Sequence, residues 1–227
     1  MPVSDLTPSA QDYLKFIWSA AEWSKEDVTI GRIAGGLGLG ASTVSQGVRK
    51  LADRGFVTHA RYGSIELTPA GRDLAVMMVR RHRLLETFLV QVLGYGWDEI
   101  HHEAEVLEHA VSEAFLARID ELLGHPVRDP HGDPIPSPNG AYHRAEAQQL
   151  TAAGPGNRVT IYRVSDADAG LLRYLAGLGL TPGTELVIEE RGTFSPGPTV
   201  RATGQDQDIT LGTQASDAVW VIPSPLH

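Results

Sequence analysis

The chain has 227 residues, no cysteine and a formal net charge of −9. This length suffices for two or three small cores, and the lack of cysteine excludes disulfides and thiolate metal ligands, as expected in a reducing cytoplasm. Because no apolar run approaches the roughly 20 residues of a membrane span and the N-terminus lacks the basic and apolar segments of a signal peptide, we expect a cytoplasmic protein with no membrane partner.

The charge is distributed unevenly along the sequence. Residues 1–83 carry a net charge of +3, whereas the remaining residues carry −12. A mildly basic segment can bind polyanionic DNA even when the whole protein is acidic. The first third of the chain is therefore the predicted DNA-binding part.

Residues 9–23 are predicted to form an amphipathic helix, and residues 29–57 predict a helix-turn-helix. In the latter, apolar residues with helical spacing are followed by the break Gly38-Leu39-Gly40, and Ser42 is the expected N-cap of a second helix. Residues 57–67 alternate around a glycine turn, as in the hairpin of a wing. The alternative is a structural helical hairpin of an enzyme, which the accompanying wing disfavours. Small hydroxyl and amide side chains can approach base edges, while Arg and Lys suit phosphates. The predicted DNA-binding residues are Ser42, Thr43, Ser45, Gln46, Arg49, Lys50 and Arg61.

A second pattern lies in residues 97–123, which contain no Gly or Pro and predict one helix ending at Gly124. At about 100° per residue, two imidazoles and two carboxylates share one arc at the border of an apolar stripe. These residues are His101, Glu105, Glu108 and His109. Half-buried like charges repel one another and lose hydration, so they require a cation. His82 and Glu86 repeat these donor types, four residues apart, on the preceding predicted helix. The alternative is a solvated acidic stripe with surface histidines.

The chain is expected to be mainly α-helical with a small all-β C-terminal domain. Residues 1–73 are predicted as a winged helix-turn-helix DNA-binding domain, and residues 74–142 as a helical dimerisation and metal-binding domain. The helices after the wing carry more apolar residues than a winged domain alone would bury, which favours a homodimer. Residues 143–156 are predicted as a linker. Residues 157–227 contain short strands with Gly/Pro turns, which favour a small barrel.

Four motifs occur in one order, and a fifth follows near the C-terminus. They are Ser42-Thr43-Val44-Ser45-Gln46, Arg81-His82-Arg83-Leu84-Leu85-Glu86, Glu105-x-x-Glu108-His109, Asp129-Pro130-His131-Gly132-Asp133-Pro134-Ile135-Pro136 and Leu178-Gly179-Leu180-Thr181-Pro182-Gly183. The ordered set resembles the diphtheria-toxin-repressor family of metal-dependent transcriptional regulators, with a C-terminal FeoA-like, SH3-like small barrel. The resemblance covers nearly the whole chain.

The resemblance implies two metal sites per subunit. The primary site is expected at Asp12, Glu105, Glu108 and His109, and the ancillary site at His82, Glu86, His101 and, from the C-terminal domain, Asp168. Asp12 and Glu105 stand where the iron-responsive branch has Met and Cys, so the chain is more similar to the manganese transport regulators, and hard oxygen donors favour Mn(II). Lys15 stands where some manganese regulators have Glu, which argues against a binuclear primary site.

The expected protein is a Mn(II)-activated homodimeric repressor that binds palindromic double-stranded operator DNA and controls manganese uptake genes, with no small-molecule substrate. Without metal, the carboxylates of the primary site are expected to repel one another and leave the first helix free. The alternatives are a Fe(II)-dependent repressor of iron uptake genes, a metal-independent winged-helix regulator and a metalloenzyme. The enzyme is disfavoured because His102-Glu103 lacks the second His of a zinc-protease helix.

Overall fold

The computed structural model describes residues 3–59, 63–190 and 197–224. The chain divides into two compact units. Met1–His82, Glu105–Leu116 and Pro136–Tyr142 form the first unit, and Arg83–Ala104, Ala117–Ile135 and His143–His227 form the second. The division falls within three helices, α4, α5 and α6, so each unit contains one end of each of them.

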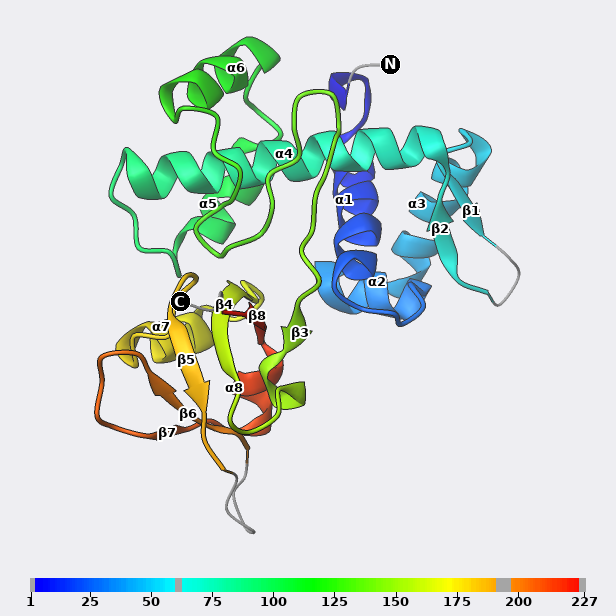
Figure 1. Cartoon of the computed structure of the whole chain (residues 1–227). Helices are drawn as coiled ribbons and strands as arrows, with labels where there is room; N and C mark the ends of the chain where they lie inside the picture. Colours follow the sequence, from blue (N-terminus) through cyan, green and yellow to red (C-terminus); the bar gives the residue numbers. More distant parts are fainter. Residues whose placement is uncertain (1–2, 60–62, 191–196, 225–227) are drawn as a thin grey trace. The chain divides into compact units, whose positions relative to one another are not determined.

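The first unit contains the winged helix-turn-helix that the sequence predicts (Figure 1). It comprises a 3-10 turn (Val3–Asp5), α1 (Pro8–Glu22), α2 (Ile30–Leu37), α3 (Ala41–Asp53) and the antiparallel hairpin of β1 (Val57–His59) and β2 (Ile65–Leu67). The side chains of Thr7 and Thr29 cap α1 and α2 by accepting backbone N–H groups. Leu14 of α1 and Val48 of α3 are fully buried in one shared core, so α1 supports the second helix of the motif.

The start of α3 differs from the prediction. Gly40, and not Ser42, is the N-cap: its backbone is extended, and its carbonyl accepts the N–H of Val44 at 3.1 Å. Ser42 lies in the first turn and is exposed. Its hydroxyl is therefore not needed to cap the helix, which leaves it available at the surface.

The helices after the wing are α4 (Pro69–Gln91), α5 (Ile100–Leu107) and α6 (Glu113–Leu122). The single helix expected over residues 97–123 is wrong, because the chain breaks after Leu107. Ser112 starts a new helix there: its hydroxyl accepts the N–H of Phe115 at 3.2 Å and its carbonyl that of Leu116 at 3.0 Å. In addition, the carbonyl of Glu108 accepts a hydrogen bond from the Arg81 guanidinium at 2.7 Å, and not from a backbone N–H of a continuing helix.

The second unit contains the small β domain. Its strands are β3 (Gln148–Gln149), β4 (Arg158–Val164), β5 (Glu185–Ile188), β6 (Thr199–Ala202), β7 (Ile209–Thr210) and β8 (Val219–Pro223), and its helices are the 3-10 turn Leu150–Ala152, α7 (Ala169–Gly177) and α8 (Thr213–Asp217). The strands form one antiparallel sheet in the order β3-β8-β4-β5-β6-β7. Leu150, inside the predicted linker, is fully buried in the core of this domain. This architecture confirms the predicted fold class. Among the described residues, no helix is both long and apolar enough to cross a membrane.

Candidate metal centres and DNA-binding helix

A cluster of carboxylates and imidazoles lies in the first unit, where α1, α4 and the end of α5 contribute to it. Its ligand-type residues are Asp12, His82, Glu105, Glu108 and His109. The structure thus brings together all four residues expected in the primary site. They form two overlapping groups, Asp12 with Glu108 and His109, and Glu105 with Glu108 and His82, and in each group the ligand atoms lie within 4.8 Å of one another. Glu108 joins the two groups.

The orientation of His109 is set by α1. Its Nδ1 lies 2.7 Å from the Gln11 side-chain oxygen, and its Nε2 lies 2.9 Å from Asp12 Oδ1. The amide nitrogen of Gln11 donates to the carbonyls of Val3 and Leu6, at 3.0 and 3.2 Å. Because these bonds fix the amide, its oxygen must face the imidazole, and Nδ1 carries the proton. Nε2 is therefore the nitrogen that can bind a metal ion beside Asp12.

Glu108 is the buried centre of the cluster. Its side chain is 0% exposed, Oε1 is 2.6 Å from Lys15 Nζ and Oε2 is 2.6 Å from His82 Nδ1. Burial alone raises the pKa of Glu108, but the hydrogen bond from His82 and the charges of His82 and Lys15 outweigh burial and lower the pKa overall. Glu108 is thus a carboxylate with both oxygens engaged.

In the sequence, Lys15 is notable only because it stands where some manganese regulators have a glutamate ligand. The structure places its ammonium group inside the cluster. Its Nζ lies 2.6 Å from Glu105 Oε1, in addition to the contact with Glu108. The expectation that the carboxylates repel one another freely without metal therefore needs correction, because an internal cation already screens Glu105 and Glu108. Sequence reasoning could not find this contact, since Lys15 and Glu105 are 90 positions apart.

The donor set fits a divalent cation. Three carboxylates and two imidazoles converge, and the chain has no cysteine. Carboxylates suit hard cations such as Mn(II), and imidazole suits iron, zinc and other transition metals. Burial raises the pKa of Asp12, against the lowering effect of the His109 and Lys15 charges. A bound cation would remove this cost of holding a carboxylate away from water.

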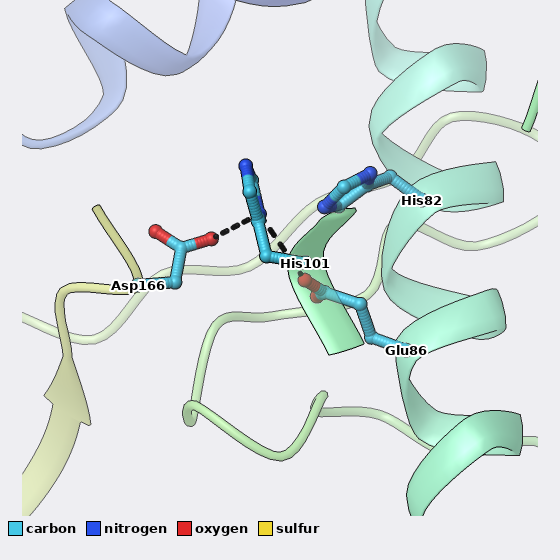
Figure 2. Close-up of side chains that lie close together, drawn as sticks. All are labelled: His82, Glu86, His101 and Asp166. Atoms are coloured by element: carbon cyan, nitrogen blue, oxygen red, sulfur yellow. Dashed lines mark ion pairs between the residues drawn. The ribbon is translucent and has the colours of Figure 1, made fainter. Parts of the chain in front are cut away.

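A second cluster gathers on the next turn of α4 (Figure 2). In the second unit, His101 Nδ1 of α5 lies 3.5 Å from Glu86 Oε1 and 3.3 Å from Asp166 Oδ2. His82, one turn before Glu86 on α4, points to the same side of the helix. Burial lowers the pKa of His101, but hydrogen bonds with Asp166 and Glu86 raise it to about 10. The structure therefore brings together the three residues expected from α4 and α5.

The C-terminal carboxylate of this cluster is Asp166, and Asp168 is not part of it. Asp168 is the N-cap of α7, and its Oδ1 accepts the N–H groups of Gly170 and Leu171 at 2.8 and 3.1 Å. A carboxylate oxygen that caps a helix is held at the first turn of that helix. The position of Asp168 directly before the helix at 169–177 was the sequence signal that could have assigned it to capping.

Two further residues, His131 and Asp129, share Glu86 with this cluster. His131 is 0% exposed, with Nδ1 3.8 Å from Glu86 Oε2 and Nε2 2.7 Å from the Trp97 carbonyl. Burial lowers the pKa of His131, but interaction with Glu86 raises it to about 10. Asp129 completes a buried group with Glu86 and His131, and burial raises its pKa, as do the charges of Asp133 and Glu86. Sequence reasoning treated this Pro-rich segment as irregular and so assigned neither residue to a site.

The predicted DNA-binding residues lie mainly on one face of α3. Val44, Val48 and Leu51 face the core. The six residues predicted from this helix are exposed: Ser42, Thr43, Ser45, Gln46, Arg49 and Lys50. Arg61, the predicted contact from the wing, lies outside the described residues. The exposed face of α3 carries hydroxyl, amide and cationic groups, which suits it to contact bases and phosphates.

Comparison with known proteins agrees with this geometry. Three family models match successive parts of the chain: the N-terminal DNA-binding domain of iron-dependent repressors at residues 5–65, their metal-binding and dimerisation domain at 68–137, and the FeoA domain at 148–223. The iron-dependent repressor IdeR of Mycobacterium leprae is 31% identical over 234 residues, which cover 96% of this chain and 99% of that protein. The diphtheria toxin repressor of Corynebacterium diphtheriae is 35% identical, over 69% of this chain and 67% of that protein.

A solved structure is also similar over nearly the full length. A manganese-dependent transcriptional repressor in complex with manganese shares 49% sequence identity and superposes with a TM-score of 0.90, covering 95% of this chain and 100% of that one. The family models describe repressors, as the sequence predicted, and not enzymes. The chain therefore belongs to the diphtheria-toxin-repressor family and is a DNA-binding, metal-dependent transcriptional repressor.

Proposed function

We propose that this repressor is activated by Mn(II), acts as a homodimer on palindromic operator DNA and controls manganese uptake genes in the cytoplasm. The observation that carries the choice of metal is the sulfur-free, carboxylate-rich donor set of the primary cluster. The similar repressor whose structure contains manganese supports the same choice. Fe(II) is the second candidate, because several relatives are named iron-dependent repressors.

We propose two metal sites in each subunit. The primary site uses Asp12, Glu105, Glu108 and His109. The ancillary site uses His82, Glu86 and His101, with Asp166 in place of the expected Asp168. In the primary site, a metal ion would connect Asp12 on α1 to the segment that follows α5. Since α1 shares its core with α3, this connection would restrict the orientation of the recognition helix.

Two such sites can supply the binding free energy that is needed to shift the repressor to its active state. Shifting a two-state equilibrium from 1:99 to 99:1 takes about 5.5 kcal/mol of differential binding. One site that binds only the active state contributes about 2.7 kcal/mol when free metal is 100 times its Kd. Two sites per subunit therefore supply about the required amount.

The homodimer is supported by apolar side chains exposed around the three helices after the wing. They are Val92, Leu93, Tyr95, Val106, Phe115, Leu122 and Val127. Exposed apolar surface of this extent is commonly covered by a partner subunit. A two-fold dimer would present two α3 helices to DNA half-sites about 34 Å, or a multiple of it, apart.

The test is a metal titration read by both DNA binding and bound-metal stoichiometry. Operator sequences are first selected from random duplex DNA in the presence of Mn(II), and affinity is then measured by fluorescence anisotropy at matched free Mn(II) and anaerobic Fe(II). We expect Mn(II) to activate at the lower free concentration, and Asp12→Ala or Glu105→Ala to abolish the stimulation. A wild-type Mn(II) response in both variants would refute the proposed site, and stronger activation by Fe(II) would favour the iron-dependent alternative.

A further inference from the structure

Lys15 occupies the place within the primary cluster where a cation is needed. It lies one helical turn after Asp12, and its side chain is 11% exposed. Its Nζ is 2.6 Å from Glu105 Oε1, 2.6 Å from Glu108 Oε1 and 3.4 Å from His82 Nδ1. An ammonium group so enclosed by carboxylates forms charge-assisted hydrogen bonds, which are about twice as strong as neutral ones.

We propose that Lys15 is a built-in competitor of the metal ion, which sets the metal concentration needed for activation and holds α1 to the 105–109 segment while metal is absent. The inference rests on the proposed use of Glu105 and Glu108 as metal ligands. Both Glu108 oxygens are engaged, one by Lys15 and the other by His82. A metal ion that takes Oε1 must therefore displace the ammonium.

Charge explains why the exchange can occur in both directions. With the imidazoles of His82 and His109 neutral, as metal binding requires, the three carboxylates Asp12, Glu105 and Glu108 carry −3. Lys15 reduces this charge to −2, so the cluster still attracts a divalent cation. A divalent ion and an ammonium group at neighbouring positions repel each other, since two cations in a partly buried site are weakly screened. The flexible four-carbon stem of Lys15 allows its head group to leave when the ion enters. Occupation by metal and the contact of Lys15 with Glu108 are thus alternatives.

Full-length Lys15→Met separates this role from a structural one, because Met keeps an unbranched stem without the charge. Mn(II) alone is titrated by calorimetry, and the binding phase lost in Asp12→Ala identifies the primary site. We expect Lys15→Met to bind Mn(II) at that site about tenfold more tightly, the change that about 1.4 kcal/mol produces, while its metal-free melting temperature falls. Loss of folding could not produce these opposite changes. Lys25→Met, at an exposed lysine, should change neither value.

Two further variants keep the test decisive. Lys15→Gln retains a hydrogen-bond donor without the charge and should also bind Mn(II) more tightly, whereas Lys15→Arg retains the charge and should stay close to wild type. Unchanged or weaker Mn(II) binding in both uncharged variants would overturn the inference. If wild type instead showed no binding phase that depends on Asp12, the proposed primary site itself would fail, which is a different outcome.

Discussion

Replacing Glu108 by Gln is the most informative perturbation of the primary cluster. The substitution keeps the size of the side chain but removes the charge that Lys15 and His82 contact, each at 2.6 Å. Lys15 would remain almost buried with Glu105 as its carboxylate partner. We therefore expect the metal-free protein to lose stability and the primary site to lose its Mn(II) affinity.

The magnitude follows from these contacts. A hydrogen bond to a charged group contributes about 1.5–3 kcal/mol, and breaking a buried ion pair costs about 3–5 kcal/mol. Taking about 3 kcal/mol, with roughly 2–4 °C per kcal/mol for a chain of this size, the melting temperature should fall by about 6–12 °C. Because the pKa of Glu108 is lowered in the folded state, its contribution is fully present above the usual value of 4.5 and is lost as the pH falls through the folded-state pKa.

Differential scanning calorimetry of metal-free protein at neutral pH measures this shift. A second scan with Mn(II) measures how far the metal raises the melting temperature. Glu103→Gln is the matched control, because Glu103 lies on the same helix α5 and is exposed, so it should behave as wild type. If Glu108→Gln lost no more stability than this control and kept the full Mn(II) gain, the reasoning about the buried carboxylate would be refuted.

Three further predictions concern the other sites. Asp166→Asn should weaken Mn(II) binding at the ancillary site by about tenfold, whereas Asp168→Asn should not, since Asn also caps helices well; calorimetry with the reverse result would contradict the assignment. The urea midpoint of metal-free protein should fall between about pH 6.5 and 10, because the raised pKa values of His101 and His131 give stability that is complete below 6.5 and lost toward 10. His131→Gln should make this pH profile shallower. On selected operator DNA, Gln46→Ala should weaken the binding free energy by about 1–3 kcal/mol and relax the sequence preference. Lys50→Ala should weaken binding to all DNA sequences and reduce the slope of log affinity against log salt concentration by about one. Equal salt slopes for the two variants would contradict this division of roles.

The features that the sequence predicted well depend on neighbours a few positions apart. Apolar periodicity and the glycines after residue 37 predicted α2, α3 and the hairpin, because burial of one face and tight turns are local properties. The spacing of Glu105, Glu108 and His109 marked them as one chemical group even though the helix that was expected to carry them is interrupted. The interruption itself has a local signal in Ser112, since serine favours the N-cap position of a helix.

Only the tertiary structure decided how the charged groups pair. Lys15 reaches Glu105 and Glu108 across 90 and 93 positions, Asp166 rather than Asp168 meets His101, and His131 lies beside Glu86. Each outcome depends on the direction of a side chain once distant helices and loops have packed, and burial decides which charges must find a partner. Composition and periodicity carry no information about that direction, so the sequence by itself determined the kinds of groups and the folded structure determined their partners.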